Sequence, residues 1–463
     1  MERRTATIRT AVLISLISTV AAPASAQEAL WGGELVSKID SLAQVTLAQG
    51  PVAALSIGVK QGDDLLLAKG YGQADIENSV PATEQTVFRI GSITKQFTAA
   101  ALMQLVEAGK IGLDDPMTEY LPDYPTQGHG VTIRHLLSHT SGIKSYTGLA
   151  TWRPKMTLDL TDEQLVDLFK DEPFDFAPGE RYLYNNSAFY LLGMIIEEVS
   201  GESYREYLND HLFGPLGLSG SVYCDEGPII RGRAEGYQRV NGELMNDDYL
   251  SMNQPGAAGA LCSTVTDLLS WTSALRAGRV VSAASYSQMT TEGTLNGGGT
   301  TNYGFGLGLG DLDGHPTVSH GGGINGFNAM LAHYPEAELD IVVLSNTSGP
   351  HAGRVAQTIA KWALGIDVPA ERIAVEVAED ILETYVGEYE LAPTFSMVVT
   401  LEDGALFGQP TGQPRFAMFA ESETKFFLRA VDAQVSFTKD DSGAVTGLIL
   451  HQNGRDQPGR KVQ

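Results

Sequence analysis

The chain has little cysteine, few cations for its length and no long hydrophobic run after its N-terminal region. Two cysteines, Cys224 and Cys262, are too few for a disulfide scaffold, and the sequence leaves open whether they pair or stay free and buried. Only 31 Lys and Arg oppose 56 Asp and Glu, which gives a formal charge of −25. Nucleic acids and anionic membranes are bound through basic patches, so neither is an expected partner.

The first residues have the pattern of an export signal. Three arginines within nine residues form a basic start, residues 11–22 are an apolar run, and Ala24–Ala26 is an A-x-A cleavage site. The apolar run is too short to span a bilayer, and no later segment is long and apolar enough to do so. We therefore expect residues 1–26 to be removed near Ala26. The mature protein would be secreted or periplasmic, without an integral membrane segment.

The remaining sequence predicts two domains, because a single core for a chain of 463 residues would be unusually large. Within residues 27–367, strand patterns occur near both ends, for example at 53–60, 304–309 and 339–344, and helical patterns lie between them. This arrangement predicts one antiparallel sheet that joins the two ends, flanked by helices and with a helical subdomain inserted. The expected class is α+β.

Residues 368–463 have a different pattern. After a short helical run, alternating segments such as 385–391 and 445–451 are separated by turn residues, as at 402–404. Many short strands with such turns predict a small antiparallel barrel or sandwich. No nucleophile with a matching base stands out in this segment.

The segment Ser92–Lys95 places a hydroxyl and an amine three residues apart. Residues 96–108 contain no glycine or proline and are rich in helix formers, with Gly91 before the serine and Gly109 after the run. Positions i and i+3 share a helix face, so the Lys95 amine can reach the Ser92 hydroxyl. An amine that has lost its proton activates a serine, and a helix N-terminus favours a developing oxyanion.

Two further segments carry candidate chemistry. Tyr184 and Asn186 precede a helical run, where a tyrosine can relay a proton and an asparagine can orient a substrate carbonyl. His320 is followed by three glycines, so Gly322 and Gly323 allow close approach of another backbone and can offer an N–H to an oxyanion. Taken singly, each has an ordinary structural reading as a capped turn or a glycine hairpin. The histidine of the Leu136–Gly142 segment is read as structural, because nothing marks it as a base.

In their order and spacing these segments resemble the serine β-lactamase and penicillin-binding-protein superfamily. The resemblance covers roughly residues 35–365 and is greatest to the branch of class C β-lactamases, D-Ala-D-Ala carboxypeptidases, D-aminopeptidases and related esterases. The family's Ser-x-x-Lys motif matches Ser92 and Lys95, its Tyr-x-Asn motif matches Tyr184 and Asn186, and its Lys-Thr-Gly motif falls on His320–Gly322. The segment after residue 367 resembles the lipocalin-like barrels appended to some of these hydrolases.

The resemblance implies an acyl-serine mechanism without a metal or organic cofactor. Ser92 would attack a carbonyl while Lys95 and Tyr184 handle its proton, and Asn186 would orient the substrate. The N–H groups of Ser92 and Gly323 would form the oxyanion hole. Histidine replaces the lysine of the third motif, which disfavours efficient β-lactam hydrolysis because imidazole holds a carboxylate less firmly than an ammonium at pH 7.

The sequence therefore predicts an exported serine hydrolase that acts on amide or ester bonds, with short D-amino-acid peptides as favoured substrates. The alternative enzymes are a class C-like β-lactamase and a carboxylesterase. The alternative outside catalysis is a cell-wall peptide-binding module, or a barrel that binds an apolar ligand beside a vestigial first domain. Retention of Ser92, Lys95 and Tyr184 argues against this last reading. Oligomeric state, stereospecificity and the role of the C-terminal domain do not follow from the sequence.

Overall fold

The computed structural model describes residues 24–49, 52–368, 374–393, 395–413, 415–428, 433–440, 442–452 and 455–462. The chain divides into two compact units, Met1–Asp367 and Val368–Gln463. The predicted export signal lies outside the described residues, except for Ala24–Ala26 in the first turn of helix α1. Within the described part of the chain, every helix is too short or too polar to cross a membrane.

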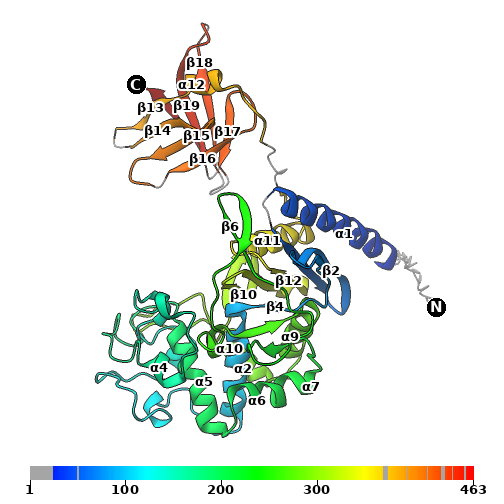
Figure 1. Cartoon of the computed structure of the whole chain (residues 1–463), viewed down its shortest axis with the longest axis vertical. Helices are drawn as coiled ribbons and strands as arrows, with labels where there is room; N and C mark the ends of the chain where they lie inside the picture. The colour runs from blue at the N-terminus through cyan, green and yellow to red at the C-terminus, as the bar shows by residue number, and fades with distance from the viewer. Residues whose placement is uncertain are drawn as a thin grey trace, which may run out of the picture. The chain divides into compact units, whose positions relative to one another are not determined.

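The first unit is built on one antiparallel sheet in the order β3-β2-β1-β12-β11-β10-β9 (Figure 1). Strand β1 near the start of the chain pairs with β12 near the end of the unit, so the predicted sheet joining both ends is confirmed. The strands of this sheet are β1 (Ala54–Gln61), β2 (Asp64–Asp75), β3 (Val80–Pro81), β9 (Gly308–Leu312), β10 (His315–Ile324), β11 (Phe327–Tyr334) and β12 (Leu339–Ser345).

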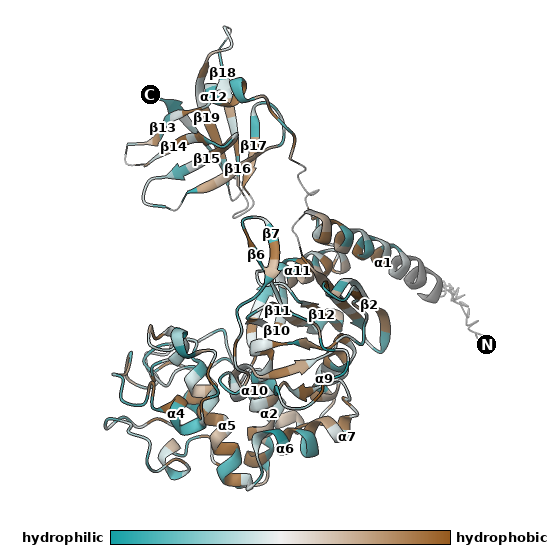
Figure 2. Cartoon of the chain, viewed as in Figure 1, coloured by the Kyte–Doolittle hydropathy of each residue, from teal (hydrophilic) through white to brown (hydrophobic). Residues whose placement is uncertain are grey.

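Helices cover both faces of this sheet (Figure 1). Along β12, Ile341 and Val343 lie on the face covered by α1 and α11, whereas Val342 and Leu344 lie on the opposite face, where α9 packs, as the two-residue period of a strand requires. The helices of the unit are α1 (Ala24–Gln49), α2 (Thr94–Glu107), α3 (Ile133–Leu137), α4 (Asp162–Val166), α5 (Asn186–Ser200), α6 (Tyr204–Leu208), α7 (Gly214–Leu216), α8 (Gly256–Gly259), α9 (Val265–Arg276), α10 (Ala283–Met289) and α11 (His351–Ala363). Helix α1 carries both polar and apolar residues and buries only the latter, including Leu35 and Ile39 (Figure 2).

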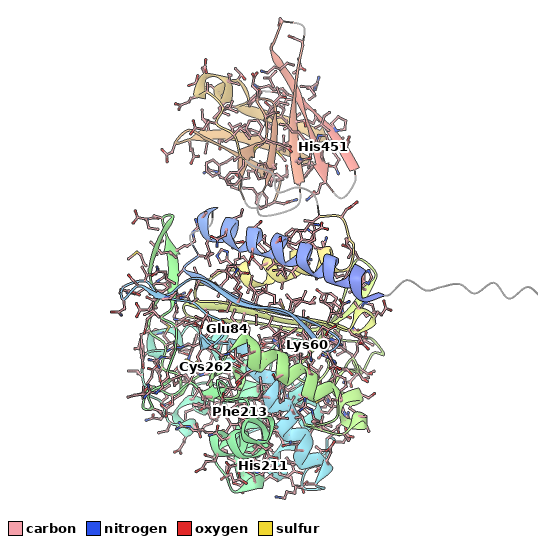
Figure 3. The ribbon with its side chains drawn as sticks, turned by 90° about the vertical axis from the view of Figure 1, so that its right-hand side faces the viewer. Lys60, Glu84, His211, Phe213, Cys262 and His451 are labelled. Carbon is pink, nitrogen blue, oxygen red and sulfur yellow. A yellow bond between two sulfur atoms is a disulfide. The ribbon has the colours of Figure 1, made fainter. Side chains whose placement is uncertain are left out.

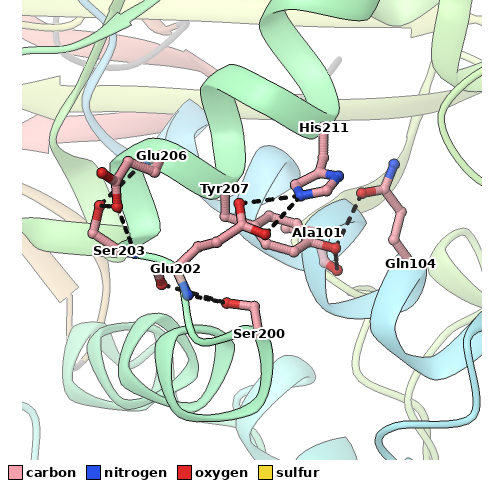
Figure 4. Close-up of polar contacts among 8 residues, drawn as sticks. All are labelled: Ala101, Gln104, Ser200, Glu202, Ser203, Glu206, Tyr207 and His211. Atoms are coloured by element: carbon pink, nitrogen blue, oxygen red, sulfur yellow. Dashed lines mark hydrogen bonds and ion pairs between the residues drawn. The ribbon is translucent and has the colours of Figure 1, made fainter.

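In the helical subdomain, side chains close in sequence cap the ends of the helices. Helix α5 begins at an Asn185 side chain that accepts from the Ala188 N–H, and it ends at Gly201 in the left-handed conformation. Helix α6 begins with a capping box between Ser203 and Glu206 and continues into a π-helical turn, where His211 bonds the Glu202 carboxylate (Figure 4).

Two small sheets lie beside the main one. The first joins β4 (Phe88–Arg89), β8 (Leu261–Ser263) and β5 (Val222–Tyr223), and the second joins β6 (Tyr237–Val240) to β7 (Glu243–Asn246). A buried disulfide links Cys224 to Cys262 (Figure 3, where Cys262 is labelled), which settles the question that the sequence left open. Because Cys262 pairs with Arg89 in the sheet, the bridge supports the strand that leads into the Ser92 turn.

The second unit is a closed barrel of eight strands preceded by helix α12 (Glu379–Thr384). Aromatic side chains fill its interior, where Tyr385 stacks on Phe437 with ring centroids 4.1 Å apart and Phe426 packs against both. The strands are β13 (Gly387–Ala392), β14 (Phe395–Glu402), β15 (Ala405–Pro410), β16 (Phe416–Ala420), β17 (Lys425–Leu428), β18 (Ala433–Lys439), β19 (Val445–Gln452) and β20 (Arg455–Lys461).

Both predicted architectures are confirmed, with one local correction. The strand expected at 304–309 is wrong, because β9 begins only at Gly308 and the preceding residues form a loop. That loop passes directly over helix α2, where a Cβ on Gly306 would lie 2.4 Å from the Lys95 carbonyl oxygen. Gly306 also has φ +69°, so glycine is required there on both counts.

Candidate active site

Ser92 lies in a single 3₁₀ turn, Gly91–Ile93, that leads directly into helix α2. Gly91 adopts φ +50°, and a Cβ there would lie 3.0 Å from the Gly323 backbone nitrogen. The serine is therefore presented at a sharp turn between strand and helix, against the third-motif strand. The first backbone N–H groups of a helix lack intrahelical partners, so this position favours negative charge on a bound oxygen.

Lys95 is completely buried and makes three polar contacts. Its Nζ lies 3.1 Å from Ser92 Oγ, 2.8 Å from Asn186 Oδ1 and 2.7 Å from the Ala258 carbonyl oxygen. Burial lowers the pKa of the amine well below its ordinary value. No neighbouring carboxylate contributes to this shift. A neutral amine donates to the two oxygens that can only accept, Asn186 Oδ1 and Ala258 O, and its lone pair then faces the Ser92 hydroxyl.

Asn186 and Tyr184 lie on the other side of the amine. The Asn186 side chain donates from Nδ2 to Thr147 Oγ1 at 3.0 Å, which fixes its oxygen towards Lys95. The Tyr184 ring lies 4.8 Å from Lys95 Nζ, and its buried hydroxyl has no hydrogen-bond partner of normal geometry among the described residues. Burial raises the pKa of Tyr184, and the nearby Ser92 hydroxyl opposes only part of that rise.

Strand β10 brings the third motif to the nucleophile. Its neighbour β9 pairs with it only as far as Ser319, so the following residues are free of a strand partner on that side. A Cβ on Gly322 would lie 1.9 Å from the Ile90 carbonyl oxygen, which means that the strand and the Ser92 turn meet through backbone atoms. Gly323 and Ser92 line the same cavity, as an oxyanion hole built from their N–H groups requires.

His320 is buried, and both of its ring nitrogens are engaged inside the protein. Nδ1 lies 2.6 Å from the Gly321 carbonyl oxygen, and Nε2 lies 2.9 Å from the Tyr303 hydroxyl. Burial lowers the pKa of His320 to about 4, with a further contribution from Lys95. The imidazole is therefore neutral near pH 7, so it has no positive charge with which to hold a substrate carboxylate.

Sequence reasoning missed the aromatic residues that surround these groups. Tyr303 packs against Tyr184, His320 and His139, with ring centroids 6.3, 5.7 and 4.7 Å apart, and Tyr182 closes the cluster. His139 accepts the Asn185 N–H at Nδ1, while its Nε2 is buried without a partner in the described structure. The only signal for Tyr303 is its place in a Tyr-Gly-Phe-Gly string, directly before the segment 304–309 that has a strand pattern.

Two cavities adjoin beside Ser92, and the serine itself lines only the smaller one. The smaller, of about 120 Å³, contains Ser92 and is walled mainly by apolar side chains, among them Tyr146, Trp152 and Leu250. The larger, of about 750 Å³, shares Thr147, Trp152 and Gly323 with it and extends past Arg153, Asp247 and Asp248. The described residues contain no cluster of three His, Cys, Asp or Glu side chains able to hold a metal ion.

The barrel also holds a serine, a histidine and an aspartate in a hydrogen-bonded chain, which corrects the expectation that no such set occurs there. Ser436 Oγ lies 2.9 Å from His451 Nε2, and His451 Nδ1 lies 2.6 Å from Asp456 Oδ1 (His451 is labelled in Figure 3). Ser436 faces outward from a strand that is paired on both sides, by β17 and β19. In the described structure the backbone at Ser436 is therefore part of the paired sheet, unlike the turn that an oxyanion hole needs beside its nucleophile.

Comparison with known proteins gives one family match for each unit. Residues 39–365 match the Beta-lactamase family model, and residues 371–461 match a domain of unknown function, DUF3471. Penicillin-binding protein 4* of Bacillus subtilis (strain 168) is 31% identical over 86% of this chain and 92% of its own.

Two solved structures are similar in sequence and in fold. The octameric penicillin-binding protein homologue from Pyrococcus abyssi has a TM-score of 0.68 and 28% identity, and the match covers 92% of this chain and all of the other. The D-amino acid amidase from Ochrobactrum anthropi SV3, solved with L-phenylalanine amide, has a TM-score of 0.63 and 25% identity over 72% of this chain and 98% of its own. The chain therefore belongs to the β-lactamase family and is a serine hydrolase of that family.

Proposed function

We propose that the protein is an exported acyl-serine hydrolase of amide and ester bonds, with D-amino-acid derivatives as its favoured substrates. The observation that carries the proposal is the buried Lys95 amine, 3.1 Å from Ser92 Oγ and held by Asn186 and the Ala258 carbonyl. A lysine that is neutral at its working pH can take the serine proton, which is the step that a free serine cannot supply.

The roles of the site residues follow from their protonation. Lys95 takes the Ser92 proton as Oγ attacks the substrate carbonyl, and the tetrahedral oxyanion forms against the N–H groups of Ser92 and Gly323. Tyr184 keeps its proton because burial raises its pKa, so it donates to the departing amine or alcohol, and the Lys95 ammonium replaces that proton. A water molecule then attacks the acyl-serine with Lys95 and Tyr184 as base and relay, and Ser92 regains its proton.

The charges around the site favour substrates without a carboxylate next to the scissile bond. Burial lowers the pKa of Lys95 and so disfavours its charged form, and His320, with a pKa of about 4, is neutral near pH 7. The wider cavity is lined by two aspartates and one arginine, which suits a substrate amine better than an acid. We therefore favour amidase, aminopeptidase or esterase activity over carboxypeptidase or β-lactamase activity.

The proposal includes the layout of the chain. Residues 1–26 are proposed as the export signal, 27–367 as the hydrolase domain and 368–463 as a lipocalin-like barrel, with a secreted or periplasmic mature protein. The buried Cys224–Cys262 disulfide supports export, because structural disulfides persist in oxidising compartments. No cofactor or metal is required by the proposed chemistry.

The test is a substrate panel on the full-length protein, read by mass spectrometry of the acyl adduct. The panel contains D- and L-phenylalanine amides, a short p-nitrophenyl ester, a D-Ala-D-Ala peptide and a chromogenic cephalosporin. We expect turnover of a D-amide or the ester, with the transient adduct on Ser92. Rapid cephalosporin hydrolysis with no turnover of amides or esters would overturn the substrate class, and the absence of any adduct would overturn the enzyme proposal.

A further inference from the structure

Among the described residues, Tyr303 makes the one hydrogen bond to the His320 ring that comes from outside the histidine's own strand. It lies in the loop between α10 and β9, 17 residues before the histidine, and it is 5% exposed. Its hydroxyl is 2.9 Å from His320 Nε2, and the described structure gives that hydroxyl no other partner. None of the family motifs found in the sequence includes this residue.

The two contacts of His320 determine which nitrogen carries the proton. The Gly321 carbonyl oxygen, 2.6 Å from Nδ1, can only accept, so Nδ1 is the protonated nitrogen. Nε2 is then an acceptor, and the Tyr303 O–H donates to it. Burial keeps Tyr303 protonated, because its pKa lies well above the ordinary value.

The groups that face His320 give no reason for the ring to be charged. They are Lys95 from α2, Tyr184 before α5, and Tyr303 and His139 from two loops, none of which carries a negative charge near pH 7. The residue opposite on β11 is the apolar Leu331. If Nε2 gained a proton, the Tyr303 hydroxyl would have to turn away from it inside a closed aromatic cluster.

We propose that Tyr303 is a positioning residue that locks His320 as the neutral Nδ1–H tautomer, and thereby excludes a fixed positive charge from the third motif. The lock leaves neither ring nitrogen free for substrate, so the site accepts a neutral amide or ester at this position. The kinetic part of this inference rests on the proposed function, whereas the tautomer does not.

Tyr182 provides a matched control. It is a tyrosine of the same cluster, its ring centroid is 5.8 Å from that of Tyr303, and no hydrogen bond joins it to His320 in the described structure. Tyr303→Phe and Tyr182→Phe each remove one hydroxyl and keep the ring, so their comparison separates the hydrogen bond from the packing.

The deciding measurement is the ¹⁵N chemical shifts of the His320 imidazole in the full-length protein, assigned by comparison with His320→Gln. We expect a neutral Nδ1–H ring in the wild type from pH 6 to 8. In Tyr303→Phe we expect a detectable Nε2–H tautomer and a pKa raised by about one unit, because the neutral ring has lost its donor. Tyr182→Phe should leave the signals unchanged.

Activity gives the second readout. We expect Tyr303→Phe to lower kcat/KM on the best neutral substrate about tenfold, with the acid limb of its pH profile altered, and Tyr182→Phe to change it less than about twofold. An Nε2–H or charged ring in the wild type at pH 7 would overturn the proposal, and so would identical spectra for the two variants. Because the wild-type tautomer decides by itself, a failure of Tyr303→Phe to fold, or the absence of any hydrolysis, leaves the inference testable.

Discussion

The two units of this chain differ in where their polar side chains lie, buried in the first and on the outer face in the second. Apart from tyrosines, every buried polar or charged side chain among the described residues, including Lys95, His139 and His320, belongs to the first unit. The described interior of the barrel is apolar and aromatic, and its Ser436–His451–Asp456 chain lies on the outer face. A serine next to a base is thus present in both units. Burial, an adjoining cavity and free backbone N–H groups occur together only around Ser92 in the structure as described.

Replacing each serine tests this difference most directly. Ser92→Ala should lower kcat by about 10⁴-fold or more and abolish labelling by a serine-directed phosphonate, because the nucleophile is lost. Ser436→Ala removes the hydroxyl of the outer chain and should leave both unchanged. The two variants are compared in one assay on the same substrate. Residual labelling of Ser92→Ala that disappears in the double variant would give the barrel a reactive serine.

Tyr385 tests whether the filled barrel matters for catalysis. The side chain is fully buried, stacks on Phe437 and donates to the Glu423 carbonyl at 3.0 Å. Tyr385→Ala should destabilise the barrel by about 3–5 kcal/mol, since it leaves a cavity and removes a stacked pair. Calorimetry should show a lowered barrel transition, while kcat/KM measured below that transition stays constant. A parallel fall in kcat/KM would show that the barrel contributes to the active site.

The disulfide belongs to the first unit alone, so its removal should affect only that unit. Cys224→Ser combined with Cys262→Ser opens a crosslink between residues 38 apart in sequence, which is worth about 2–4 kcal/mol. Urea unfolding should show the loss in the transition that accompanies loss of activity. The wild type with reductant is the control for the substitutions. Equal shifts in both transitions would show that the units unfold together.

The pH dependence of kcat/KM tests the protonation states of the buried site, with the smallest expected effect of these experiments. Lys95 must be neutral to act as base, and burial lowers its pKa, so log(kcat/KM) should rise with pH and reach a plateau well below pH 10.5. Because burial raises the pKa of Tyr184 above 10, the plateau should persist to at least pH 10 wherever the protein stays folded. An acid limb at the ordinary lysine pKa would contradict the buried-amine mechanism.

The sequence predicts local and periodic features well. The i, i+3 spacing places the Lys95 amine at hydrogen-bonding distance from Ser92, and the two-residue periodicity finds β11, β12 and most of the barrel strands. The sequence pattern does not single out helices α9 and α11, although each is amphipathic and lies directly on the sheet. They occur among strand patterns, where a short apolar run fits either structure.

The rest of the site depends on contacts between distant segments. The Ala258 carbonyl reaches Lys95 across 163 positions of sequence, and any residue type could have supplied that oxygen. Tyr303 binds His320 from a loop whose next residues, 304–307, have a strand pattern in the sequence but form no strand in the structure. The histidine itself was found, but its neutral state follows from burial, which a single sequence does not state.

The glycines around Ser92 have a consequence for how this enzyme can change. Gly322 meets the Ile90 carbonyl, and Gly306 meets the Lys95 carbonyl, so the turn of the nucleophile, helix α2 and strand β10 approach one another through main-chain atoms at these two points. Side chains such as Trp152 and Leu250 line the cavity beside Ser92 and are not among the atoms that these glycines meet. Laboratory evolution could therefore substitute the side chains that line the cavity, to admit new acyl groups, without changing the distances between the catalytic residues. Gly306 and Gly322 are the positions that such a library should keep as glycine.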